Sequence, residues 1–280
     1  KLPDLNDLQL EDKWILSKYN DVVKSVTENL DKFELGIALS NLYDFIWENF
    51  CDWYIELVKP RLFDKENPTG KTAQYVLTYV LSNTMKLLHP FMPFITEEIW
   101  QTLPHEGDAL IVAQWPEYCQ EHDFPEAELE MQRIMDVIRG VRNRRAEMNV
   151  PPSRKTNLYI ATAEPNTFEN GIAILNKLAY ATQITIGQAF DIEGAVTIVT
   201  NDAKVYIPMD ELVDKKAELA RLNKELETAK KQFAQVNGKL NNQGFLTKAP
   251  AQVVEGVKKD FDTLTERIQL IESSISALQS

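Results

Sequence analysis

The amino-acid sequence predicts a mainly α-helical chain in which a helical bundle, a small α+β unit and a C-terminal antiparallel coiled-coil hairpin follow one another. Three observations predict this fold class. Apolar residues recur at steps of three and four through residues 1–125, short β-rich runs follow within 126–208, and apolar seams of period 3.5 run through 209–280. We take these ranges as the predicted domains, and 44% hydrophobic residues in a chain of 280 permit a core in each.

The N-terminal segment is expected to form a bundle of helices. Residues 15–30 and 35–57 each place apolar side chains at steps of three and four, which gives each helix one apolar face. Pro60 is expected to end the second helix because proline lacks the backbone N–H that an α-helix uses. A third helix, about residues 72–88, is apolar nearly all round and should lie centrally, and a short fourth helix begins near Thr96.

The middle segment changes character. It opens with an amphipathic helix over residues 126–148. Four short runs then have the β-branched and aromatic composition of strands: TNLYIATA, ITIG, AVTIVT and AKVYIP. The stretch ENGIAILNKLAY, between the first two runs, is a helix candidate, so the segment is predicted to be a small α+β unit.

The C-terminal segment carries two apolar seams separated by the turn-rich stretch NNQGFLTKAPA. Folding the chain back near residue 247 brings the seams into one register, with Leu219 opposite Ile275, Leu226 opposite Ile268, Phe233 opposite Phe261 and Leu240 opposite Val254. Because the pairing is consistent along both seams, we predict an antiparallel hairpin within one chain, and therefore a monomer.

Composition and charge exclude several classes of protein. No apolar run approaches the ~20 residues of a membrane span, so no membrane partner is expected. The two cysteines, Cys51 and Cys119, supply neither a disulfide framework nor a Cys-only zinc site, which favours a cytoplasmic location. Residues 211–280 hold 11 basic and 10 acidic side chains, a net charge of +1, so the rest of the chain carries −13 of the total of −12. Basic clusters can nevertheless act locally, because salt screens distant charges.

No catalytic or metal-binding constellation is recognisable in the sequence. The three histidines are scattered, and neither a Gly-x-Gly-x-x-Gly fingerprint nor a P-loop is present. We therefore predict no catalytic residues, no metal ligands and no cofactor for this chain.

Four arginines stand within seven positions of IRGVRNRRAEMNVPP, residues 138–152. On a helix, Arg145 falls inside the apolar face, Arg142 lies at its edge and Arg139 lies just beyond it. Two interpretations are open for Arg142 and Arg145. They pair with bundle carboxylates such as Asp52, because an unpaired buried guanidinium is costly, or they bind phosphate, which arginine contacts with two parallel hydrogen bonds.

Several motifs resemble a known family. WENFCDWYIELVKPRL, LHPFMPFITEEIW, IRGVRNRRAEMNVPP and GFLTKAP, in this order, are similar to the C-terminal part of the valyl-tRNA synthetase family, and the similarity covers essentially the whole chain. Arg144 departs from this resemblance, since the family usually has an aliphatic residue there. The His-x-Gly-His and Lys-Met-Ser-Lys-Ser signatures of the family's catalytic domain are absent.

The resemblance implies a division of labour. The bundle would be the anticodon-binding domain, and the coiled coil would be an arm that touches the outer corner of tRNA(Val). The parent enzyme would join valine to tRNA with ATP, and its N-terminal catalytic and editing domains would be this chain's other partners. The chain itself is expected to bind tRNA without catalysing. The alternative is a coiled-coil module for protein interaction or dimerisation, which sedimentation would distinguish.

Basic side chains are the candidates for RNA contact, because they can neutralise phosphate. The candidates are Arg139, Arg142, Arg145, Lys59, Arg61, Arg154, Lys155, Lys239, Lys248 and Lys258.

Overall fold

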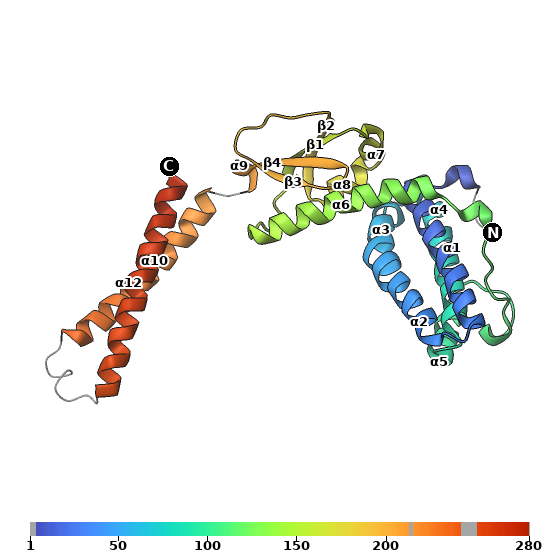
Figure 1. Cartoon of the computed structure of the whole chain (residues 1–280), viewed down its shortest axis with the longest axis horizontal. Helices are drawn as coiled ribbons and strands as arrows, with labels where there is room; N and C mark the ends of the chain where they lie inside the picture. Colours follow the sequence, from blue (N-terminus) through green and yellow to red (C-terminus); the bar gives the residue numbers. More distant parts are fainter. Residues whose placement is uncertain (1–3, 213–214, 242–250, 280) are drawn as a thin grey trace. The chain divides into compact units, whose positions relative to one another are not determined.

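The structure, a computed structural model, describes residues 4–212, 215–241 and 251–279. The described chain is mainly helical and contains a four-stranded sheet, as predicted (Figure 1). It divides into two compact units. The first comprises Lys1–Arg144, Leu158–Asp191 and Thr197–Tyr206, and the second comprises Arg145–Asn157, Ile192–Val196 and Ile207–Ser280. No helix among the described residues is long and apolar enough to span a bilayer.

The bundle lies within the first unit. Its helices are α1 (Leu10–Asp31), α2 (Leu35–Asp44), the π-helix η2 (Phe45–Tyr54), α3 (Ile55–Phe63), α4 (Gly70–Leu88) and α5 (Pro93–Gln101), with short 3₁₀ turns at Leu5–Asp7, Leu110–Val112 and Gln120–His122. Helix α1 packs against α2, η2 and α4, and α3 packs against α4. The fully buried Trp14 and Tyr54 are among the largest side chains of this core.

The second predicted helix exists, and its predicted apolar face is buried except at the start. Leu35 and Leu39 are 54% and 39% exposed, whereas Ala38, Leu42 and Phe45 are buried. Ten residues of π-helix follow, ending with a bond from the Ile55 N–H to the Phe50 carbonyl, and π turns hold more residues than α turns. Phe50, Trp53 and Leu57, which continue the predicted steps of three and four, are buried, so the prediction fails only at the start of α2.

Pro60 does not end this helix, which contradicts the prediction. Helix α3 continues through Pro60 to Phe63. Proline removes the hydrogen bond to the carbonyl four residues earlier, here that of Glu56. The Nζ of Lys177, from a distant segment of the same unit, donates to this carbonyl at 2.9 Å. The free acceptor is thus satisfied from outside the helix, so the helix continues for three more residues.

The α+β segment follows the prediction closely. It contains α6 (Pro125–Glu147), β1 (Thr156–Thr162), α7 (Pro165–Asn170), α8 (Ile172–Leu178), β2 (Ala181–Gly187), β3 (Ala195–Val199) and β4 (Ala203–Pro208). The strand order is β2-β1-β4-β3, and β1 pairs antiparallel with β4, with Tyr159 opposite Tyr206. At Gly140 a Cβ atom would lie 2.7 Å from the Ile198 side chain, so glycine lets α6 approach the sheet closely.

The C-terminal segment forms the predicted hairpin. After α9 (Met209–Leu212), helices α10 (Lys215–Leu240) and α12 (Ala251–Gln279) pack along each other (Figure 1). The rings of Phe233 and Phe261 lie 4.8 Å apart, as the predicted register requires. Leu226 and Ile268 pack on one apolar cluster with Leu222, Ala229 and Ile271. The stretch GFLTKAP and the side chain of Leu219 lie outside the described residues.

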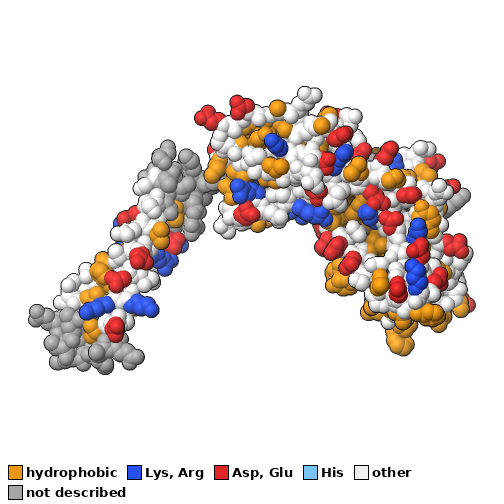
Figure 2. Space-filling model, in the orientation of Figure 1, with side chains coloured by type: hydrophobic (Ala, Val, Ile, Leu, Met, Phe, Trp, Pro, Cys, Tyr) orange, Lys and Arg blue, Asp and Glu red, His pale blue; other side chains and the backbone are white. Residues whose placement is uncertain are grey.

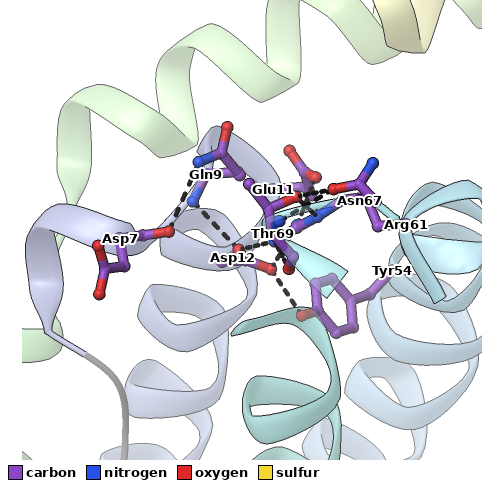
Figure 3. A network of polar contacts seen from close by, with 8 residues as sticks. All are labelled: Asp7, Gln9, Glu11, Asp12, Tyr54, Arg61, Asn67 and Thr69. Atoms are coloured by element: carbon purple, nitrogen blue, oxygen red, sulfur yellow. Dashed lines mark hydrogen bonds and ion pairs between the residues drawn. The ribbon is translucent and has the colours of Figure 1, made fainter. Parts of the chain in front are cut away.

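A buried polar network joins the helices of the bundle (Figure 3). Arg61 is only 7% exposed. Its Nη1 donates to Glu11 Oε1 at 2.7 Å and to Asp12 Oδ1 at 2.9 Å, and its Nη2 donates to Asp12 Oδ2 at 2.8 Å. Its Nε donates to the Thr69 hydroxyl at 2.9 Å and Nη2 also to the Thr69 carbonyl at 3.0 Å. These bonds use all five N–H groups of the guanidinium.

The acidic side of this network is also enclosed. Asp12 is fully buried and accepts two further bonds, from the Tyr54 hydroxyl at 2.8 Å and from the Gln9 backbone N–H at 3.1 Å. Burial, and then the nearby charge of Asp12, raise the pKa of Glu11 above 4.5, against the attraction of Arg61. Because the folded-state pKa of Glu11 is raised, this one group favours the fold most at low pH, and its contribution falls as the pH rises through the raised pKa.

The hairpin register can be tested by crosslinking. In a chain with Cys51→Ser and Cys119→Ser, Phe233→Cys and Phe261→Cys should form an intrachain disulfide under mild oxidation, because the two rings already touch. Phe233→Cys with Ile275→Cys is the control, since about 14 residues of helix separate Ile275 from Phe261, or roughly 21 Å. Equal crosslinking of both pairs on non-reducing gels would disprove the register.

The network should make Arg61 essential for stability. Arg61→Met strands a buried carboxylate, so the free energy of unfolding should fall by roughly 3–5 kcal/mol in urea melts. Lys59→Met removes a cation from an ion pair with Glu56 whose side chains are 41% and 42% exposed, and should change stability by less than about 1 kcal/mol. Similar small losses in both variants would show that the network contributes little.

Candidate nucleic-acid interface

The structure removes Arg61 from the candidates for RNA contact. Every N–H of its guanidinium is bonded inside the bundle, and its side chain is buried. The prediction treated Arg61 as a surface residue just beyond a helix end. Since α3 runs through Pro60, Arg61 instead lies in the last turn of a helix and faces α1. Its role is structural.

Arg145, in the second unit, is also structural. It is 2% exposed and donates to the Thr156 hydroxyl at 3.3 Å, to the Pro151 carbonyl at 3.1 Å and to the Arg154 carbonyl. These acceptors are oxygens of the segment that follows α6, whereas the sequence suggested carboxylates of the bundle. Asn149, with φ +54°, turns the chain sharply after α6, so the end of the helix and the following loop enclose the guanidinium.

Arg142 and Arg139, also on α6, are progressively more accessible than Arg145, as their helical positions predicted. Arg142 is half-buried; its Nε donates to the Leu178 carbonyl at 2.7 Å, and its guanidinium lies 5.8 Å from the Tyr180 ring. Arg139 is exposed and pairs with Asp136 at 3.3 Å.

Arg139 also lies over an aromatic ring. Its guanidinium is 5.2 Å from the centroid of Trp53, a distance at which the ring attracts a cation. Trp53 is 8% exposed, so the ring itself is fixed in the core. Arg139 therefore combines a solvent-facing charge with a rigid support.

Lys177, on α8, is a basic residue that sequence analysis missed. It is exposed, and its Nζ donates to the Glu56 carbonyl, while Lys59 pairs with the carboxylate of the same glutamate. Burial, followed by repulsion from Lys59, lowers the pKa of Lys177, against the attraction of Glu56. The only sequence signal for this contact was Pro60, whose missing N–H leaves the carbonyl open.

These side chains form a group that we call the α6 basic cluster: Lys59, Arg139, Arg142 and Lys177. They come from three helices, α3, α6 and α8, yet all contact residues 53–56 or the end of α8 within the first unit. The structure thus brings together three of the candidates and adds Lys177.

The remaining candidates lie elsewhere. Lys155, Lys239 and Lys258 are exposed, and Arg154 is half-buried with its carbonyl bonded to Arg145. Lys248 lies outside the described residues. RNA contact by Arg154 and these four lysines stays a prediction.

Exposed aromatic side chains are a second feature that sequence analysis missed. Tyr43 and Trp47 are 59% and 52% exposed, with ring centroids 6.2 Å apart. Figure 2 shows hydrophobic side chains on the surface of the bundle. The signal available in the sequence was their position, since both lie outside the series of apolar residues spaced by three and four.

Within the described ranges, no group of three or more His, Cys, Asp or Glu side chains is placed to hold a metal ion.

The structural role of Arg145 can be tested by stability. Arg145→Ala leaves buried oxygens of the following loop without their donor, and should lower the free energy of unfolding by about 1–3 kcal/mol. Lys155→Ala, at an exposed position of the same loop, is the control and should change stability by less than about 0.5 kcal/mol. If Arg145→Ala instead leaves the urea midpoint unchanged and weakens RNA binding, the structural assignment is wrong.

Known proteins share both parts of this architecture. Residues 12–160 match the family model of the anticodon-binding domain of tRNA ligase, and residues 214–279 match that of the valyl tRNA synthetase tRNA binding arm. The chain is 44% identical to the valine–tRNA ligase of Carboxydothermus hydrogenoformans over 276 residues, 97% of this chain and 31% of that protein. It is 42% identical to that of Clostridium acetobutylicum over 283 residues, covering 100% and 32% of the two chains.

The relative from Bacillus subtilis, also a valine–tRNA ligase, is 41% identical over 261 residues, 91% of this chain and 30% of that protein. The chain thus spans about a third of the length of the curated relatives that it matches. With its bundle and its hairpin each matching a family model in the same order, the chain belongs to the tRNA-ligase anticodon-binding-domain family and carries the tRNA-binding arm of valyl-tRNA synthetases.

Proposed function

We propose that this chain binds tRNA(Val) as the tRNA-recognising part of a valine–tRNA ligase, with the bundle at the anticodon and the hairpin at the outer corner of the tRNA. The observation that carries this proposal is the presence of both matched modules, in order, in one chain. Valine specificity rests on the relatives, which are valine–tRNA ligases.

The hairpin has the surface that a backbone-binding arm needs. Its apolar residues pack between α10 and α12, so the lysines on its flanks face solvent. Lys230 pairs with Glu272 at 2.7 Å and Arg267 pairs with Glu225 at 2.8 Å. Basic and acidic side chains are therefore interspersed on the surface of the hairpin. The exposed Lys239, Lys258 and Lys259 are the described arm residues that we favour for phosphate contact.

The bundle offers a different kind of contact. Unpaired bases of an RNA loop are commonly held by stacking on aromatic side chains. Tyr43 and Trp47 present such rings to solvent. We propose them as stacking residues for the anticodon loop.

The wider activity is also a proposal. The chain would supply RNA recognition to the ATP-dependent joining of valine to tRNA, with the reaction and its editing carried out by other domains of the ligase. ATP would therefore be bound by the parent enzyme rather than by this chain. The setting would be the cytoplasm, and the chain would be monomeric, since the seam of the hairpin is filled within one chain. A concentration-dependent dimer in sedimentation would favour the alternative, a coiled-coil dimerisation module.

Binding to RNA provides the direct test. The chain should bind tRNA(Val) more tightly than the same tRNA with a substituted anticodon, as measured by fluorescence anisotropy at two salt concentrations. Lys239→Gln with Lys258→Gln should weaken binding to both RNAs equally and reduce the salt slope by about 0.9 for each lost phosphate contact. Equal affinity for both RNAs in the unaltered chain would argue against anticodon recognition, and an unchanged salt slope would argue against the arm lysines.

A further inference from the structure

We propose that Arg139, Lys59 and Lys177 form one phosphate-binding site for the RNA backbone on the first unit, with Arg142 as a positioning residue. This proposal rests on the proposed function. It adds a site that lies neither on the hairpin nor at the exposed aromatic rings, and it assigns a role to a lysine whose position became evident only in the fold.

The three cations converge on one short stretch of helix. Arg139 lies over Trp53, while Lys59 and Lys177 contact the side chain and the carbonyl of Glu56. The charges of three separate helices, α3, α6 and α8, thus contact residues 53–56, and we place one phosphate group there.

The cluster carries an excess of positive charge where the chain is otherwise acidic. Its four basic side chains face two carboxylates in the contacts described above, those of Glu56 and Asp136. The pKa of Lys177 is lowered, so its ammonium gains less from its neighbours than it loses by burial. An incoming phosphate would add a negative charge beside these cations.

The site is also built to hold its charges in place. Pro60 leaves the Glu56 carbonyl open, and Lys177 reaches it at 2.9 Å. Arg142 donates to the Leu178 carbonyl at 2.7 Å, which fixes the end of α8 directly beside Lys177. The buried ring of Trp53 packs against the guanidinium of Arg139. Such support reduces the side-chain freedom that binding would otherwise remove.

The contacts favour an RNA phosphate over a protein carboxylate as the ligand. Arg139 and Lys59 already pair with carboxylates at the surface, Asp136 and Glu56, and these pairs are solvent-exposed and weak. A phosphodiester carries a full charge and oxygens that arginine contacts with two hydrogen bonds. Binding can therefore displace the exposed pairs at small cost.

Charge-removing variants of the full chain test the site. Lys177→Gln and Arg139→Gln should each weaken binding to tRNA(Val) by roughly tenfold. The loss should be equal for a tRNA with another anticodon, and each variant should reduce the salt slope by about one. Lys177→Arg, which keeps the charge, should restore most of the affinity. The urea midpoints of Arg139→Gln and Lys177→Arg should match that of the unaltered chain. Lys177→Gln also removes the donor to the Glu56 carbonyl, so its RNA affinity is compared with that of Lys177→Arg under conditions in which both variants are folded.

Lys65→Gln is the matched control, because Lys65 is an exposed lysine of the same unit outside the cluster. If Lys177→Gln and Arg139→Gln bind RNA as this control does, while the unaltered chain binds tRNA(Val), the phosphate site is wrong and the proposed function stands. If the unaltered chain binds no RNA, both proposals are overturned. A double variant that loses no more than the stronger single variant would confirm that the two cations share one phosphate.

Discussion

The bundle depends on one buried guanidinium. Arg61 holds the carboxylates of Glu11 and Asp12 on α1 and both oxygens of Thr69, which precedes α4, while Tyr54 completes the shell of Asp12. Burying these charges is favourable only if every donor and acceptor finds a partner, and here every arginine N–H does. Because the requirement is geometric, it fixes the relative placement of α1, α3 and the start of α4, and hence the surface on which RNA contact is proposed.

The chain uses its basic residues in two different ways. Arg61 and Arg145 lie inside and bond to fixed oxygens, which suits the rigid fork of arginine. Arg139 and Lys177 keep their charges at the surface while a buried ring or a backbone carbonyl holds them. The number of arginines in the sequence does not distinguish these two classes. A basic side chain is structural when it is buried, and it can bind a ligand when it is exposed.

Periodic features were predictable from the sequence, and features that depend on distant contacts were not. The seams of α10 and α12 gave the register that Phe233 and Phe261 confirm, because coiled-coil packing follows directly from spacing. Helical positions likewise ordered the burial of the arginines on α6. The continuation of α3 depends on Lys177, which lies more than a hundred residues away in sequence, and no local pattern encodes that contact. The core location of Arg61 and the basic cluster were missed for this same reason.

The π-helix η2 has a consequence for how the bundle tolerates changes in length. Wide turns hold more residues than α turns, so a deletion in Phe45–Tyr54 that left the remaining turns unchanged would shift the phase of the helix beyond it. Every residue beyond it would then rotate by about 100° about the helix axis. Arg61 would turn away from Asp12, and Trp53 and Glu56 would no longer meet α6 and α8. The wide turns thus set the rotational phase of α3, and the bundle is far more sensitive to the number of residues in this segment than to the identity of its exposed side chains.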